Sequence, residues 1–258
     1  MDSYVFITGA SSGFGKACAE IFAKNGYNLV LSARRLNRLT ALKEELQASF
    51  GIAIEIGELD VRIESEVNTF VSNLPEGVKN NIEFLINNAG LAAGRDSLEN
   101  GLISDWDQMI DTNIKGLLYV SKAIIPLLKK NNQGHIFNIS SIAGKEVYAN
   151  GNVYCATKHA VDSLSKAMRI ELVEHGVKVT NIAPGAAETE FSLVRFKGDE
   201  SIADSIYDGY DALQAEDIAH VIYFAATQPK HVTLNDIVIM PTAQASATIL
   251  HKQVNKAL

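Results

Sequence analysis

The stretch YVFITGASSGFGKACAEIFAK, residues 4–24, decides the fold of this chain. Tyr4 to Thr8 are all β-branched or aromatic and predict a buried strand, and Lys16 to Lys24 repeats apolar residues at helical spacing. The two elements are joined by three glycines, Gly9, Gly13 and Gly15. Glycine lets a backbone turn sharply and approach a pyrophosphate, and the N–H groups at a helix start attract anions. The stretch therefore predicts a dinucleotide-binding turn, with an incidental glycine-rich turn as the alternative because its spacing differs from the commonest fingerprint.

The rest of the chain continues the alternation of strands and helices. Further strands are predicted at Asn28–Ala33, Ile52–Leu59, Ile82–Ile86, His135–Ile139, Lys178–Ile182 and Ile237–Met240. Helices are predicted between them at Leu36–Phe50, Glu64–Leu74, Ser104–Lys130, Asn152–Glu174 and Glu216–Thr227. Parallel strands need such crossovers, so the pattern predicts an α/β fold: a single Rossmann-type doubly wound domain over residues 1–258, with about seven mostly parallel strands flanked by helices on both faces. A polar insertion at about 186–210 is expected to form a substrate loop.

The composition excludes several classes of partner. The 258 residues carry 23 Lys and Arg against 30 Asp and Glu, and this net charge of −7 disfavours nucleic acid or an anionic membrane as the main partner. No apolar stretch is long enough to span a membrane, and no signal peptide is visible. Two cysteines, Cys18 and Cys155, are too few for a disulfide framework, so a cytoplasmic protein is expected. The six histidines show no metal-ligand spacing, and no metal is expected.

The end of the second predicted strand indicates which dinucleotide binds. Many dinucleotide sites place an acid there for a ribose 2′-hydroxyl, or a cation where a 2′-phosphate is held. Here the sequence reads Ser32, Ala33, Arg34 and Arg35, with no carboxylate and with two guanidiniums that can bind phosphate. A solvated helix start is the alternative, but cations at that end of a helix oppose its dipole. We therefore expect NADP as the cofactor.

Tyr154 and Lys158 are candidate catalytic residues because they stand four apart near the start of a predicted helix and so share one face. An ammonium favours a nearby phenolate, and lowering the pKa of a tyrosine from about 10 to about 7 takes about 4 kcal/mol. Ser141, and not its neighbour Ser140, is expected to hold the reacting oxygen, since it follows the fifth predicted strand at the edge where open α/β sheets bind ligands. Asn113, a poor helix former within a predicted helix, is expected to bind water or backbone. The alternative to a catalytic Tyr154 and Lys158 is an ordinary exposed Tyr/Lys pair on the surface of a helix.

Together these residues resemble a known set of motifs. The sequence is similar to the short-chain dehydrogenase/reductase family at TGASSGFG (8–15), Asp60-Val61, NNAG (87–90), Asn113, Ser141, YCATK (154–158) and PGAAET (184–189), in the same order and approximate spacing. The resemblance covers essentially the whole chain. It implies an oxidoreductase acting on CH–OH donors, and it implies a homotetramer.

The resemblance also implies a role for each matching residue. Tyr154 would be the acid/base, Lys158 would lower its pKa and bind the nicotinamide ribose, and Ser141 would orient the substrate oxygen. Asn113 would continue a proton relay through water to Lys158. The implied cofactor contacts are Gly9, Ser11, Ser12, Gly13, Phe14 and Gly15 around the pyrophosphate, Asp60 and Val61 at the adenine, Asn88 along the cofactor, and Pro184, Gly185, Ala187 and Thr189 at the carboxamide. Phe14 stands where the family more often has isoleucine, which exchanges one apolar residue for another.

A closer resemblance is to the NADP-dependent 3-hydroxy acid dehydrogenases, at GLAAG (90–94), DWDQMIDTN (105–113), GNVYCATK (151–158) and TEFSLVRFKGDE (189–200). It implies a small 3-hydroxy acid substrate of the serine, allo-threonine or 3-hydroxypropionate type. A carboxylate substrate would favour a nearby cation, for which Arg195 and Lys197 are candidates, with ordinary solvated charges as the alternative. Other candidate functions are a short-chain reductase of another ketone, a sugar or a β-ketoacyl substrate, and a non-catalytic NADP-sensing protein. Pro241 to His251 is expected to lie across another subunit.

Overall fold

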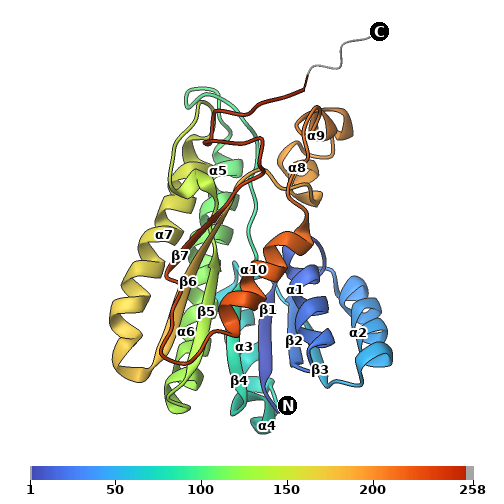
Figure 1. Ribbon diagram of the computed structural model, residues 1–258, viewed down its shortest axis with the longest axis vertical. Helices are drawn as coiled ribbons and strands as arrows, with labels where there is room; N and C mark the ends of the chain where they lie inside the picture. The colour runs from blue at the N-terminus through green and yellow to red at the C-terminus, as the bar shows by residue number, and fades with distance from the viewer. Residues whose placement is uncertain (1, 254–258) are drawn as a thin grey trace.

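The computed structural model describes residues 2–253, except for the side chains of residues 202–204. Its centre is a seven-stranded parallel sheet with the strand order β3-β2-β1-β4-β5-β6-β7 (Figure 1). The strands are β1 (Tyr4–Thr8), β2 (Asn28–Ala33), β3 (Ile54–Glu58), β4 (Ile82–Asn87), β5 (Gly134–Ile139), β6 (Val177–Pro184) and β7 (Asp236–Ile239). The strand order reverses between β1 and β4, and ligands of open α/β sheets bind at such a point, outside the carboxyl ends of the strands.

Helices cover both faces of the sheet. One face carries α1 (Gly13–Lys24), α2 (Leu36–Phe50) and α10 (Ala215–Ala226). The other face carries α3 (Glu64–Asn73), α4 (Glu76–Lys79), α6 (Leu117–Lys130) and α7 (Asn152–Leu172), while α5 (Ile103–Ile110) contacts α7. The predicted α/β architecture with about seven parallel strands is thus confirmed. Within the described residues, no helix combines the length and apolar character needed to cross a membrane.

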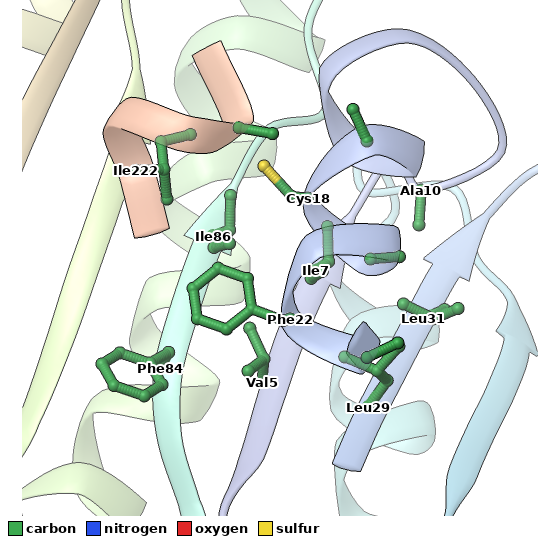
Figure 2. Packing of buried hydrophobic residues seen from close by; sticks show 14 of the residues in the cluster. Val5, Ile7, Ala10, Cys18, Phe22, Leu29, Leu31, Phe84, Ile86 and Ile222 are labelled. Carbon is green, nitrogen blue, oxygen red and sulfur yellow. The ribbon is translucent and has the colours of Figure 1, made fainter. Parts of the chain in front are cut away.

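The packing of α1 on the sheet fixes the position of the glycine turn before it. Figure 2 shows Phe22 of α1 lying against Phe84 and Ile86 of β4, with Ile222 of α10 packed beside them. Phe22 is fully buried, and its ring centroid lies 5.7 Å from that of Phe84. Burial of each such side chain contributes about 2 kcal/mol. Because α1 is held on β1 and β4 in this way, the turn that connects β1 to α1 stays at the edge of the sheet where the strand order reverses.

Two predicted segments differ from the structure. The predicted helix Ser104–Lys130 is divided by a π-helical turn at Asp111–Gly116. At that turn a Cβ on Gly116 would stand 2.7 Å from Val61 Cγ2, so the helix comes unusually close to the loop after β3. The predicted loop at about 186–210 contains two short helices, α8 (Glu190–Arg195) and α9 (Glu200–Ser205). Both differences lie beside the cavity described next.

Candidate active site

A cavity of about 1080 Å³ opens at the carboxyl ends of the central strands. It is lined by most of the predicted site residues: Gly9, Ser11, Ser12, Gly13, Phe14, Arg34, Arg35, Asp60, Val61, Asn88, Ser141, Tyr154, Lys158, Pro184, Gly185, Ala187 and Thr189. Two predicted residues, Gly15 and Asn113, stand behind its wall. Residues from seven different segments therefore meet at the point where the strand order reverses.

The glycine turn has the shape that a pyrophosphate requires. Gly9 and Gly13 have φ values of 65° and 51°, in the left-handed region that glycine tolerates best. A Cβ on Gly15 would stand 2.5 Å from both the Asn88 Nδ2 and the Gly9 carbonyl oxygen, so this glycine allows close packing behind the turn. The N-cap Ser12 makes no side-chain hydrogen bond to the first turn of α1. The N–H groups at the helix start are therefore without a side-chain cap and fit a phosphate.

The arginine end of the cavity is ordered by hydrogen bonds to the same turn. Arg35 donates from Nε to Ser11 Oγ (3.2 Å) and from Nη2 to Ser12 Oγ (2.8 Å). Its Nη1 lies 2.9 Å from Glu190 Oε2, and Arg38 Nη1 lies 2.6 Å from Glu190 Oε1. Sequence reasoning missed Arg38 and Glu190, although the position of Arg38, three residues after Arg35 on one helix, was a usable signal. Two guanidiniums and two hydroxyls at one point fit a 2′-phosphate.

The other arginine at this end, Arg34, is exposed and lies near Asp60. The pKa of Asp60 lies below its ordinary value, mainly because Arg62 hydrogen-bonds the carboxylate; Arg34 adds a smaller electrostatic effect. Asp60 is thereby fixed in the loop after β3, beside Val61. The two residues predicted to flank an adenine thus lie side by side in the wall of the cavity.

Tyr154 and Lys158 lie together on α7 and are both buried against the cavity. The Lys158 Nζ is 5.9 Å from the centre of the Tyr154 ring and donates a 2.8 Å hydrogen bond to the carbonyl oxygen of Ile139. Burial lowers the pKa of Lys158 to about 8. The ammonium and the phenol therefore share one face of the helix and one cleft.

The phenol itself is surrounded by opposing influences. Burial raises the pKa of Tyr154 well above its ordinary value, and the neighbouring Tyr148 adds to the effect. A hydrogen bond with Ser141 and the positive charge of Arg195 act in the opposite direction. The lowering of this pKa by Lys158 remains a prediction, and Arg195 is a second cation in position to favour the phenolate.

The two neighbouring serines have different roles. Ser140 is buried and donates from Oγ to the carbonyl oxygen of Lys158 at 2.9 Å, which joins β5 to α7. Ser141 lines the cavity, accepts a 3.1 Å hydrogen bond from the Ala143 N–H and hydrogen-bonds to Tyr154. Of the two, Ser141 is therefore the one whose hydroxyl lies beside the phenol.

Asn113 lies in the π-helical turn and fixes the loop after β4. Its Nδ2 donates to the Leu91 carbonyl oxygen (2.8 Å) and to Thr157 Oγ1 (3.0 Å), and its Oδ1 accepts from the Leu91 N–H (2.9 Å). A Cβ on Gly90 would stand 3.2 Å from Asn113 Oδ1 and 3.4 Å from Lys158 Nζ. Both polar atoms thus face one small space that glycine keeps open. A π-helical turn at such a place is typical of functional sites.

Arg195 and Lys197, which the sequence alone does not distinguish, point to different places. Arg195 lines the cavity, where its guanidinium lies 5.5 Å from the centre of the Tyr154 ring and Nη1 donates to the Tyr148 hydroxyl (3.1 Å). Its Nε and Nη2 are buried and have no hydrogen-bond partner among the described residues. Lys197 instead pairs with Asp105 at 2.9 Å. A buried guanidinium with two unpartnered nitrogen donors is suited to an anion.

The segment Pro241–His251 packs on its own chain, and its expected place across another subunit remains a prediction. Gln244 Oε1 accepts a 2.8 Å hydrogen bond from the Ala186 N–H, and the Ala247 N–H donates to Glu146 Oε2 at 2.8 Å. Leu250 lines the cavity. Because the loop after β6 leaves backbone donors unpaired by the sheet, the side chain of Gln244 satisfies one of them.

A glycine-rich turn suited to a phosphate and a Tyr/Lys/Ser cluster in one cleft of a doubly wound sheet define an oxidoreductase that uses a dinucleotide. The chain belongs to the short-chain dehydrogenase family, whose family model matches residues 3–199.

Relatives match nearly the whole chain. A sulfoacetaldehyde reductase of Chromohalobacter salexigens is 48% identical over 246 residues, which cover 95% of this chain and 96% of the relative. The NADP-dependent 3-hydroxy acid dehydrogenase YdfG of Escherichia coli K12 is 41% identical over 251 residues, or 96% and 99% of the two chains. A solved structure described as the closed form of serine dehydrogenase complexed with NADP+ superposes with a TM-score of 0.91 at 41% identity, covering 97% of this chain and 100% of that one.

Proposed function

We propose that this chain is an NADP-dependent oxidoreductase that transfers hydride between the nicotinamide and the alcohol carbon of a small 3-hydroxy acid. The observation that carries the proposal is one cleft in which the Tyr154 phenol lies beside a hydroxyl, an ammonium and a guanidinium. Two nitrogens of that guanidinium have no hydrogen-bond partner within the described part of the chain. The relatives named for NADP-dependent 3-hydroxy acid dehydrogenation and the NADP+ complex of serine dehydrogenase support it.

NADP supplies the hydride acceptor or donor when it is bound. Gly9 to Phe14, with Gly15 behind them, would hold the pyrophosphate on the start of α1, and Arg34 and Arg35 would hold the 2′-phosphate. Asp60 and Val61 would lie beside the adenine and Asn88 along the cofactor. Pro184, Gly185, Ala187 and Thr189 would meet the carboxamide. These assignments rest on the placement of all these residues except Gly15 around one cavity.

The side chains of the cleft divide the handling of the proton between them. In the oxidative direction Tyr154 Oη takes the hydroxyl proton of the substrate while Ser141 Oγ orients the same oxygen; in reduction the proton returns by the same path. Lys158 favours the phenolate and binds the ribose. Asn113 would connect Lys158 to bulk water through the small space that Gly90 keeps open, since Asn113 Oδ1 and Lys158 Nζ both face that space.

Arg195, with the Tyr148 hydroxyl, would bind the carboxylate of the substrate through its Nε and Nη2. A sulfonate is a second candidate for the same position, because the sulfoacetaldehyde reductase is 48% identical to this chain. Initial rates on serine, 3-hydroxypropionate, 2-hydroxyethanesulfonate and 1-propanol, followed by NADPH absorbance, separate the candidates. Indifference to the anionic group would instead favour a reductase of another ketone, a sugar or a β-ketoacyl substrate.

The role of the phenol is tested by Tyr154→Phe, which removes the hydroxyl and keeps the ring. We expect the variant to bind NADPH with nearly unchanged affinity and to lose about 10²- to 10⁴-fold in kcat, the usual contribution of a general acid or base. Retention of near-normal turnover would refute the acid/base role. Tight NADPH binding by the wild type with no hydride transfer on a broad alcohol panel would favour the NADP-sensing alternative.

We propose a cytoplasmic homotetramer as the assembled form. Large apolar side chains are exposed on α6 and α7, with Leu118 38% exposed and Ile170 77% exposed, and apolar surface of this kind is suited to contact with another copy. Light scattering coupled to gel filtration measures the mass directly. A single-chain mass at micromolar concentration would contradict the assembly.

A further inference from the structure

Glu190 occupies an unexpected position for an acidic residue in a site that should bind phosphate. It is the first residue of α8, and its two carboxylate oxygens bridge two guanidiniums: Oε2 to Arg35 Nη1 (2.9 Å) and Oε1 to Arg38 Nη1 (2.6 Å). Burial acts to raise the pKa of Glu190, but the hydrogen bonds from Arg38 and Arg35 outweigh it, and the pKa lies below its ordinary value. The carboxylate is therefore charged at neutral pH.

Arg35 is shared between Glu190 and the phosphate-binding turn. Its Nε and Nη2 contact the Ser11 and Ser12 hydroxyls, and its Nη1 faces Glu190. A doubly charged 2′-phosphate that binds at Ser11 and Arg35 comes within reach of the carboxylate. Two anions cannot both take Nη1 without repulsion. The position of Glu190 is thus that of an internal anion competing with the cofactor for the same guanidinium.

The helix that Glu190 begins also carries Arg195 at its other end. Its C-terminal end is held separately, because the Gly94 N–H donates to the Arg195 carbonyl oxygen (3.1 Å) and Lys197 pairs with Asp105. At about 1.5 Å per residue, α8 spans roughly 9 Å between the phosphate end and the substrate end of the cavity. The N-terminal end of α8 is attached by the ion pairs of Glu190 with Arg35 and Arg38, and a 2′-phosphate would compete for these arginines.

We propose that Glu190 is a built-in competitor of the cofactor 2′-phosphate, which pairs with Arg35 and Arg38 until NADP displaces it and thereby releases the N-terminal end of α8. The inference rests on the proposed function, since it takes the 2′-phosphate to bind at Arg35. NAD lacks this phosphate and leaves Glu190 in place. The choice between NADP and NAD would then depend both on binding affinity and on whether the N-terminal end of α8 is released.

The test compares Glu190→Gln with the control Glu188→Gln. Glu188 stands two residues before Glu190, and its side chain contacts Gln214, so the control removes the same charge without touching the arginines. Calorimetry at low ionic strength measures the affinity of both variants and the wild type for adenosine 2′,5′-bisphosphate and for 5′-AMP. Because exposed ion pairs are modest in strength, we expect Glu190→Gln to bind the bisphosphate about three- to tenfold more tightly and 5′-AMP unchanged. The control should match the wild type for both ligands.

Hydrogen exchange of residues 190–195 supplies a second readout. The bisphosphate should speed exchange in the wild type, and in Glu190→Gln exchange should be fast without ligand. Equal or weaker bisphosphate binding by Glu190→Gln, or wild-type exchange that does not respond to the bisphosphate, would overturn the competition. If the wild type itself does not prefer the bisphosphate to 5′-AMP, the NADP assignment of Arg35 fails and the competition fails with it.

Discussion

Replacement of Lys158 by methionine is expected to stabilise the cofactor-free protein while it removes catalysis. Lys158 is 5% exposed, and burial lowers its pKa from the ordinary 10.5 to about 8. At 1.36 kcal/mol per pKa unit, keeping this ammonium charged inside the fold costs about 3 kcal/mol at neutral pH. Methionine fills a similar space without charge, but the Ile139 carbonyl oxygen loses its 2.8 Å donor, which costs about 1–2 kcal/mol. The net expectation is a gain of about 1–2 kcal/mol in the free energy of unfolding.

The same shift predicts how this gain depends on pH. The pKa of Lys158 is lower in the folded chain than in the unfolded one, so the cost of charging it is present in full below about pH 8 and fades as the pH rises toward 10.5. The wild type therefore becomes more stable over this range, whereas the methionine variant does not, because methionine has no charge to lose. The advantage of Lys158→Met should therefore shrink by about 1 kcal/mol between pH 7 and pH 9.

Urea unfolding followed by circular dichroism measures both quantities, with protein concentration fixed because assembly contributes to apparent stability. Thermal melting is a second measure, at about 2–4 °C per kcal/mol for a chain of this size. The control is Lys24→Met, which changes an exposed lysine at the far end of α1 and should alter stability by less than about 0.5 kcal/mol at either pH. A methionine variant that is less stable than the wild type at pH 7, or an advantage that does not shrink by pH 9, would refute the burial cost.

Two further predictions concern the turn and the serines. Gly15→Ala should lose about 1–3 kcal/mol of stability and bind NADPH more weakly, because the new Cβ would stand 2.5 Å from the Gly9 carbonyl oxygen and Asn88 Nδ2. The control is Gly77→Ala, whose new Cβ would have no atom within 4 Å. Equal melting temperatures of the two variants would contradict the close packing at Gly15. Ser141→Ala should lower kcat about tenfold or more with stability nearly unchanged. Ser140→Ala should keep most of its kcat but lose about 1 kcal/mol of stability, because the hydrogen bond to the Lys158 carbonyl oxygen is lost. Steady-state rates and urea unfolding measure both effects, and the reverse pattern would exchange the roles of the two serines.

The sheet and the positions of the site residues could be predicted because their signals are local. A parallel strand covered on both faces must be apolar along its length, so runs such as Tyr4–Thr8 and Asn28–Ala33 are visible without any tertiary information. Polar residues that directly follow such strands meet at one edge of the sheet. This rule predicts that Ser141 and the glycine turn lie close together, and both line the same cavity.

The features that escaped prediction depend on contacts between distant segments. The π-helical turn at Asp111–Gly116 is a change of backbone hydrogen bonding inside a segment predicted as one helix, and its Asn113 side chain binds Leu91 in the loop after β4. Arg35 and Glu190 are separated by 155 residues, so no pattern relates them. Arg195 and Lys197 are two residues apart but point to different places, because the backbone turns after α8: Lys197 has a φ of 55° and pairs with Asp105. Charge alone did not distinguish the two cations.

The charges in the cleft relate its function to its stability. Among the described residues, the two carboxylates that line the cavity, Asp60 and Glu190, are both paired with arginines. Within the same part of the chain, the Lys158 ammonium donates to a carbonyl oxygen, and two buried nitrogens of Arg195 have no hydrogen-bond partner. Buried cations without counter-ions are costly, and in a chain of net charge −7 this local positive surplus is compensated only when anions bind. The phosphates of a dinucleotide and the carboxylate of a hydroxy acid are such anions. The groups proposed to carry the chemistry would therefore also be the ones whose electrostatic cost ligand binding relieves.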